Sequence, residues 1–297
     1  FIGEAGVPHA QTHHLPNPVW LDVEDEADAG EPASGGEGER LLLYPTRAIR
    51  RKNIGEFLLW AALSQGGDRF GVTLAPRNPA AKPVYEGWVQ TAADLKLPVA
   101  FEVGEKSDLP FVELLRSAAA AVTTSVAEGF GLAFLEPWLV GRPLVGRKLP
   151  EITREFEEAG VDLKGLYERA LVPLEWVGKE RFRNRIAQGL ADALAQYRWT
   201  MTDDYLDRAV ACALAGDAVD FAKLDEEMQK QVLRILAGSP EARREVSPPA
   251  PGDADVSSQT IEQNRTLIRR QYALPAYGER LEKLYHTVAA SPAGKVE

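Results

Sequence analysis

The stretch Ala119-Ala-Ala-Val-Thr-Thr-Ser-Val-Ala-Glu-Gly-Phe-Gly-Leu-Ala-Phe-Leu-Glu136 carries the clearest structural signal in the chain. Residues 119–124 are small or β-branched and predict a buried strand, and the Gly-Phe-Gly after it predicts a turn that opens a helix. Such a turn aims unpaired backbone N–H groups at an anion. Glu128 and Glu136 would repel a lone phosphate, but they could accept hydrogen bonds from sugar hydroxyls. The segment therefore suits a ligand with both phosphates and hydroxyls, such as a nucleotide-sugar. The alternative is an ordinary turn with two solvated acids.

Short apolar runs alternate with amphipathic ones from residue 40 to about residue 158. We expect strands at residues 41–44, 70–75, 99–103, 119–124 and 143–146. The strict β/α order predicts right-handed crossovers, an α/β fold and a doubly wound parallel sheet, with additional C-terminal helices. Ligands of such sheets bind beyond the carboxyl ends of the strands. Arg47, Gly104 and Glu128 each follow an expected strand end, so we expect them to meet at one edge.

A second motif, Thr46-Arg-Ala-Ile-Arg-Arg-Lys-Asn53, directly follows the first expected strand. Arg47 offers a planar fork of donors and Lys52 offers a point charge, a suitable pair for two phosphates. Arg50 and Arg51 are additional cations that we expect to be solvated. Residues 53–56, which begin with the last residue of this motif, predict a capping box at the start of a helix.

Together, the two motifs resemble the donor-binding half of retaining GT-B glycosyltransferases, the group that includes glycogen and sucrose-phosphate synthases. Glu128 and Glu136 match the family's Glu-x7-Glu element, and Arg47 and Lys52 match its diphosphate-binding Arg and Lys. Thr46 departs from the pattern because the family usually has Gly there. The resemblance covers roughly residues 13–22 and 40–151 and implies a Rossmann-like donor domain of a GT-B fold.

The resemblance also implies roles for individual residues. Arg47, Lys52 and Glu128 would be catalytic, the cations by stabilising the leaving diphosphate and the acid by orienting the sugar. The implied donor-binding residues are Arg47, Lys52, Gly104, Glu105, Lys106, Ser125, Glu128, Gly129, Phe130, Gly131, Leu132 and Glu136. No metal and no cofactor is expected, the nucleotide-sugar is the substrate, and the acceptor is unknown.

The domain organisation is inferred from the resemblance together with shifts in composition. We expect the end of an acceptor domain at 1–22, a flexible linker at 23–39, a nucleotide-sugar-binding domain at 40–190, a helical extension at 191–237, a flexible loop at 238–258, and C-terminal helices at 259–297. Most of the acceptor domain would then be missing, so we expect the chain alone to be inactive.

Composition excludes several other classes of protein. The chain has 297 residues, of which 45% are hydrophobic and 26% are charged, with a formal net charge of −10. The acidic balance argues against nucleic acid as a partner, and no apolar run is long enough to span a membrane. The single Cys212 cannot form an internal disulfide; we expect a buried thiol and a cytoplasmic protein.

Two alternatives stay open. One is a non-catalytic module that binds nucleotide-sugars, and the other is a different GT-B enzyme, such as a nucleotide-sugar epimerase. The first remains because the family pattern weakens beyond Glu151. The second shares the sheet but would not require both motifs in this arrangement.

Overall fold

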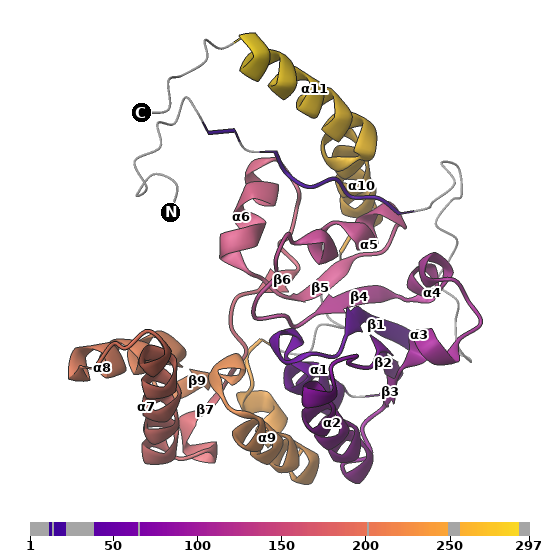
Figure 1. The fold of residues 1–297 in the computed structure, drawn as a ribbon. Helices are drawn as coiled ribbons and strands as arrows, with labels where there is room; N and C mark the ends of the chain where they lie inside the picture. The colour runs from indigo at the N-terminus through magenta and orange to yellow at the C-terminus, as the bar shows by residue number, and fades with distance from the viewer. Residues whose placement is uncertain are drawn as a thin grey trace.

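The computed structural model describes residues 12–13, 15–21, 39–64, 66–200, 202–248 and 256–290. Its centre is a parallel six-stranded sheet with the strand order β3-β2-β1-β4-β5-β6 (Figure 1). The strands are β1 (Arg40–Arg47), β2 (Asp68–Leu74), β3 (Val99–Phe101), β4 (Ala120–Thr123), β5 (Leu144–Arg147) and β6 (Leu166–Tyr167). The expected α/β class and the five expected strands are confirmed, and the order is that of doubly wound dinucleotide-binding sheets. With only two residues, β6 is too short for the sequence pattern to predict.

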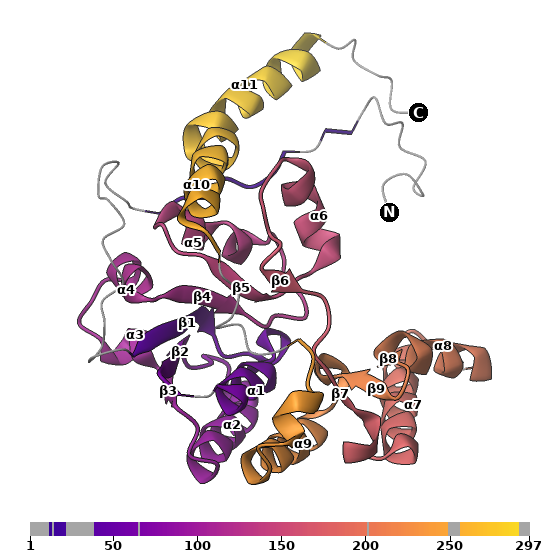
Figure 2. The ribbon, with the colours of Figure 1, turned by 180° about the vertical axis from the view of Figure 1, so that it is seen from behind.

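Helices cover both faces of the sheet, as Figures 1 and 2 show from opposite sides. Alternate residues of β1 enter different cores: Leu42 and Tyr44 lie in one core and Leu43 in the other. The first core includes α1 (Ile54–Leu63), α2 (Lys82–Asp94) and α9 (Glu226–Gly238). The second includes α4 (Phe111–Ser117), α5 (Glu136–Leu139), α6 (Pro150–Glu158) and α10 (Ser258–Tyr272). Burial on both faces explains why the strands are apolar without a break.

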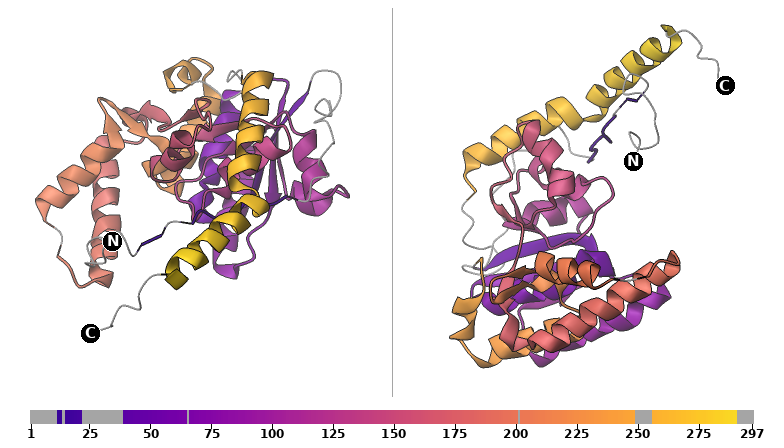
Figure 3. Two further views of the ribbon diagram at one scale, coloured as in Figure 1. Left: turned by 90° about the horizontal axis from the view of Figure 1, so that it is seen from above. Right: turned by 90° about the vertical axis from the view of Figure 1, so that its left-hand side faces the viewer.

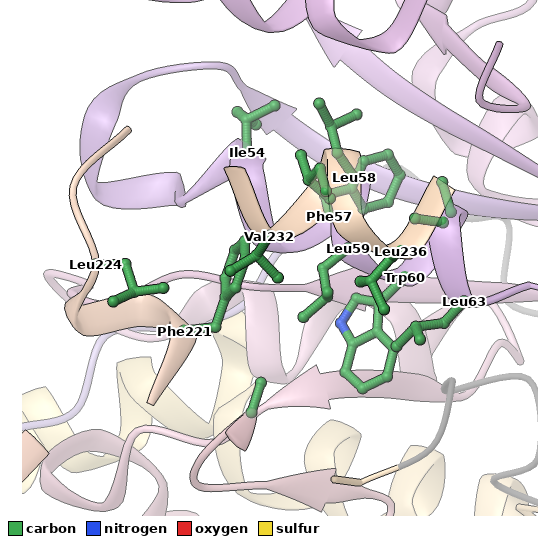
Figure 4. Close-up of a cluster of buried hydrophobic side chains, with 14 of the residues drawn as sticks. Ile54, Phe57, Leu58, Leu59, Trp60, Leu63, Phe221, Leu224, Val232 and Leu236 are labelled. Atoms are coloured by element: carbon green, nitrogen blue, oxygen red, sulfur yellow. The ribbon is translucent and has the colours of Figure 1, made fainter. Parts of the chain in front are cut away.

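Helix α1 is buried along its whole length because the sheet lies on one side of it and α9 on another. Figure 4 shows Phe57 and Trp60 of α1 beside Val232 and Leu236 of α9. The expected capping box at residues 53–56 is wrong. Asn53 has a left-handed backbone (φ 49°) and caps no N–H group, and its side chain donates to Glu56 instead.

A small antiparallel sheet lies beyond β6 in the chain and was not predicted from the sequence. Its order is β7-β9-β8, with β7 at Leu171–Pro173, β8 at Leu214–Ala215 and β9 at Ala218–Asp220. Two helices, α7 (Lys179–Gln196) and α8 (Asp203–Ala213), connect β7 to β8. Helices were expected here and are present, but strands of two or three residues leave no periodic signal. The expected boundary between residues 190 and 191 lies inside α7.

The C-terminal helices form as the sequence predicts. Helix α10 buries Asn264, Ile268 and Tyr272, and α11 (Leu274–Ala290) extends away from the sheet (Figure 3). The N-terminal segment joins them, because the Val19 amide donates to the Tyr272 carbonyl at 2.7 Å. The short helix α3 (Val103–Lys106) comes directly after β3.

Several expectations concern segments at the limits of the described chain. The linker at 23–39 lies outside the described residues except for Glu39. The loop at 238–258 lies outside them at 249–255, but up to residue 248 it is ordered: Ala242–Glu245 forms a 3₁₀ turn, and Ser247 pairs with Leu171. The described helices include none that is long and apolar enough to cross a membrane. Cys212, expected to be buried, is exposed on α8, which buries Leu206 and Ala213 instead.

Candidate functional site

The candidate site lies where the strand order reverses. β1 and β4 are neighbours, with Leu42 beside Ala120, but the chain continues from β1 to β2 on one side and from β4 to β5 on the other. The two loops that leave these strands therefore diverge, which is where doubly wound sheets form their ligand crevice. Both sequence motifs occupy these loops, so the expected convergence of the β1 and β4 motifs is present.

Hydrogen bonds hold the β1 loop against the β4 loop. The Tyr44 hydroxyl and the Thr124 hydroxyl each donate to the Lys52 carbonyl at 3.0 Å. The Val126 amide donates to the Arg51 carbonyl at 2.9 Å. Tyr44 is fully enclosed, and burial raises its pKa to about 12, so it stays a neutral donor. Sequence reasoning missed Tyr44 and Thr124 as parts of the site because both belong to apolar or small-residue runs.

Ser125 is a predicted donor-binding residue, and its side chain faces inward. Its hydroxyl is buried and lies 2.7 Å from the Tyr44 hydroxyl. The described contacts of this side chain therefore support the loop, while its position beside the site is set by the backbone.

Lys52 and Glu128 form an ion pair between the β1 and β4 loops, although 76 positions separate them in the chain. The two side chains are only 12% and 8% exposed. Arg51 is exposed, as expected, and it also approaches the second carboxylate oxygen of Glu128 at 3.3 Å. Arg50 is solvated as expected, with 80% of its side chain exposed and Glu226 at 3.4 Å. Glu128 therefore pairs with two of the four cations in the motif.

The second acid, Glu136, lies near the same lysine. Burial raises the pKa of the Glu136 carboxyl, and the Lys52 ammonium lowers it in part. Lys52 thus pairs with Glu128 and lies near enough to Glu136 to favour its charged form. A phosphate can pair with Lys52 only if Glu128 moves away, whereas hydroxyls can bind to the two acids as they stand.

The Gly-Phe-Gly turn leads into a shorter helix than the sequence predicts. Gly131 has φ of 74°, and a Cβ there would overlap Ile152 and come within 3.0 Å of Phe156, so only glycine fits. The expected helix is a 3₁₀ turn at Leu132–Phe134 and then the four-residue α5. Such a short helix supplies little dipole, so any anion binding depends on side-chain cations and individual amides.

Phe130 and Gly129 lie at the exposed tip of this turn. Phe130 is exposed, and a Cβ on Gly129 would meet no other atom within 4 Å. A cavity of about 240 Å³ lies beside the tip. Its lining comes from the N-terminal segment, the turn, the 3₁₀ turn after it and α6: Leu15, Pro16, Asn17, Gly129, Phe130, Leu132, Leu135, Glu151, Ile152, Glu155 and Phe156.

Arg47 ends β1 and is held toward β2. Its guanidinium donates to the Ala75 carbonyl at 2.7 Å, while the Thr73 hydroxyl donates to the Thr46 carbonyl at 2.7 Å. Lys52 turns the other way, toward β4. The two predicted diphosphate ligands therefore lie at the same sheet edge, on opposite sides of the β1 loop.

The residues after β3 are farther from Lys52 and Glu128, because β3 is the outermost strand of the sheet. Gly104 packs against β2, since a Cβ would lie 3.1 Å from the Thr73 carbonyl oxygen. Lys106 pairs with Glu102 at 3.2 Å, and Glu105 is exposed. Within the described chain, no recorded contact joins Gly104, Glu105 or Lys106 to Lys52 or Glu128.

A larger cavity of about 1080 Å³ opens at the other end of the strands, beside the first residues of β1, β2 and β3. Its charged residues include Arg40 and Arg69, which pair with Asp68 and Glu39. Neither motif reaches this edge. We place the candidate site where the β1 and β4 loops meet, because Lys52 of one motif pairs there with Glu128 of the other. The described residues include no cluster of three or more His, Cys, Asp or Glu side chains that could hold a metal, and metal independence stays a prediction.

Comparisons with known proteins give distant similarities. No family model matches the chain. Mannosylglucosyl-3-phosphoglycerate synthase of Petrotoga mobilis is 25% identical over 241 residues, which are 77% of this chain and 46% of that protein. The chain thus spans about half the length of this curated relative.

Among solved structures, the match to TarM covers 84% of this chain and 35% of the TarM chain, with 14% identity and a TM-score of 0.42. The match to the pneumococcal O-GlcNAc transferase GtfA, solved with UDP and GlcNAc, covers 93% of this chain and 39% of the GtfA chain, with 13% identity and a TM-score of 0.41. Because both TM-scores are below 0.5, the fold is assigned from the strand order of the sheet and not from these matches.

Proposed function

We propose that this chain is the nucleotide-sugar-binding half of a retaining GT-B glycosyltransferase. The observation that carries the proposal is the ion pair of Lys52 with Glu128 where the β1 and β4 loops meet, with Glu136 near the same lysine. A cation flanked by two acids suits a ligand that joins phosphates to sugar hydroxyls. A ligand with phosphates alone would meet the two carboxylates.

In the proposed reaction, the two cations would bind the diphosphate and the two acids would bind the sugar and the ribose. The incoming diphosphate would replace Glu128 as the partner of Lys52, and Arg47 would contribute a second cation from the β2 side. Glu128, released from the lysine, would accept hydrogen bonds from the sugar, and Glu136 would accept them from the ribose. Cleavage of the sugar–phosphate bond builds negative charge on the leaving diphosphate, and Lys52 and Arg47 would stabilise that charge. No metal is needed for this role.

In this proposal, the acceptor binds a second domain. The name of the curated relative suggests a glycosylated phosphoglycerate product, so 3-phosphoglycerate derivatives are the first acceptors to test. The comparisons support the proposal through the name of this relative, a synthase of a glycosylated phosphoglycerate.

The second candidate is a non-catalytic module that binds nucleotide-sugars. Two observations favour it: the Ser125 hydroxyl is occupied by Tyr44, and the resemblance to the catalytic family weakens beyond Glu151. Such a module would bind the same ligands and would transfer nothing when joined to an acceptor domain.

Calorimetry with UDP, GDP and ADP, and with the corresponding nucleotide-sugars, tests the proposal directly. We expect one base to be preferred and the binding to be unchanged by EDTA. Transfer to 3-phosphoglycerate or its glucosyl derivative is then measured with the full-length parent protein. Absence of binding to every nucleoside diphosphate would reject the proposal, and binding without transfer would favour the non-catalytic module.

A further inference from the structure

A buried network of charges lies directly beneath the β1 loop. Arg147 on β5 donates to Glu56 of α1 and to Asp220 of β9, with closest distances of 2.7 Å to each. All three side chains are buried. Burial opposes the charge of Arg147, but the attraction of Glu56 and Asp220 outweighs it and raises the pKa of Arg147. The Tyr167 hydroxyl also donates to Glu56, at 2.7 Å.

This network continues to the residue next to Lys52. The Asn53 amide donates to Glu56 at 2.8 Å, and the Gln229 amide donates to the Asn53 side-chain oxygen at 3.0 Å. Gln229 also donates to the Phe221 carbonyl at 3.0 Å. Gln229 belongs to α9 and lies 176 positions from Asn53 in the chain. A segment remote from the motif thus reaches the loop that carries the cation.

The chain makes room for this contact. A Cβ on Gly55 would overlap the Gln229 side chain and lie 2.8 Å from Trp88, so a larger residue would displace α9. Around the amide, Val232 and Leu236 of α9 pack on α1 (Figure 4). These apolar contacts join α9 to α1. A buried glutamine among them calls for a further reason, because a polar group there must find partners.

Asn53 is therefore held from two sides. Its side chain is held from below by Glu56 and Gln229, while its carbonyl accepts from Thr124 at 3.1 Å on the site side. Its left-handed backbone turns the chain between the cation and α1, a conformation that Asn adopts more readily than most residues. The direction in which Lys52 leaves the loop depends on both sets of contacts.

We propose that Asn53 and Gln229 are positioning residues for Lys52, so that the segment at residues 166–248 sets the affinity of the site for the diphosphate. The inference rests on the proposed function for its ligand. Its structural part, the ordering of the β1 loop by α9, can be tested without any ligand.

The test uses the full 297-residue chain with Gln229→Met, which keeps the side-chain length and removes the amide. Val232→Ala is the matched control, since it weakens the same α1–α9 packing without touching Asn53. Hydrogen exchange is measured in the peptide that contains the Lys52 and Asn53 amides, which donate to Ile49 and Arg50. Calorimetry with UDP, GDP, ADP and the matching nucleosides measures affinity.

We expect Gln229→Met to speed exchange in this peptide and to weaken diphosphate binding roughly tenfold, the usual scale for a lost buried hydrogen bond. Nucleoside binding should not change. Val232→Ala should lower the melting temperature. It should leave hydrogen exchange in this peptide, and the ratio of diphosphate to nucleoside affinity, as in the original chain. Asn53→Gly, which keeps the left-handed backbone accessible, should reproduce the selective loss.

The outcomes separate the two claims. If no nucleoside diphosphate binds the original chain, the proposed function fails, and exchange in the loop still decides the structural claim. If diphosphates bind and Gln229→Met behaves like Val232→Ala in both readouts, the positioning role is overturned and α9 merely stabilises the fold.

Discussion

Substituting Glu128 with Gln should make the bare nucleoside diphosphate bind more tightly. In the unliganded chain, Glu128 is the partner of Lys52, and Arg51 is also within 3.3 Å of it. A diphosphate has to break this pair before it can use the lysine. The amide of Gln carries no charge, so the substitution lowers the cost of releasing Lys52.

The size of the effect depends on the burial of the pair. Exposed ion pairs contribute about 0–1 kcal/mol, whereas hydrogen bonds to charged groups contribute about 1.5–3 kcal/mol. The Lys52–Glu128 pair is mostly buried and belongs nearer the second range. Gln retains part of the hydrogen bond, so we expect a gain of about 1–2 kcal/mol, or roughly 5- to 30-fold in affinity.

The nucleotide-sugar should gain less, because Glu128 also binds the sugar in the proposed mechanism. Titration calorimetry of both ligands, with and without Glu128→Gln, gives the two affinities. We expect discrimination in favour of the nucleotide-sugar to fall. Weaker binding of the bare diphosphate to Glu128→Gln would refute the reasoning, since the acid would then assist phosphate binding instead of competing with it.

Three further predictions concern other parts of the molecule. Arg147→Met should lower the free energy of unfolding in urea by about 3–5 kcal/mol because two buried carboxylates lose their partner; a loss below about 1 kcal/mol would mean that water reaches them. Gly131→Ala should both destabilise the chain and abolish ligand binding, whereas Gly129→Ala, which meets no neighbour, should leave the melting temperature unchanged. Because burial raises the pKa of Glu136 above its ordinary value of 4.5, this acid should protonate at a higher pH than an exposed Glu. Ribonucleotide binding should then weaken as the pH falls from about 7 to about 5, and 2′,3′-dideoxynucleotide binding should not; equal pH profiles would remove Glu136 from the ribose site.

The sequence predicts the sheet and the meeting of the two motifs for a simple physical reason. Parallel strands buried on both faces are continuous apolar runs, and their carboxyl ends share one edge. Lys52 and Glu128 come after two such runs, so their proximity is predictable even though their direct pairing is not. The pairing depends on side-chain directions within two irregular loops, which local patterns do not specify.

Polar contacts between segments far apart in the chain could not be predicted from the sequence. Glu56, Arg147 and Asp220 come from three segments, and each alone looks like a surface charge. Glu56 in particular fits a capping box by local pattern, but tertiary contacts turn Asn53 and Glu56 inward to Gln229 and Arg147. The small strands β7 to β9 escape prediction for a related reason, since only their pairing with one another defines them.

The placement of the diphosphate beside Lys52 is best tested by comparing Lys52→Ala with Arg50→Ala. Both residues lie in the same 3₁₀ turn, but Lys52 faces the crevice, and Arg50 is solvated beside Glu226. Calorimetry is performed with the preferred nucleoside diphosphate and with its nucleoside. We expect Lys52→Ala to weaken diphosphate binding by about 1.5–3 kcal/mol, with little change for the nucleoside and none for Arg50→Ala. Equal losses for both ligands, or for both variants, would contradict the assignment of the diphosphate to this crevice.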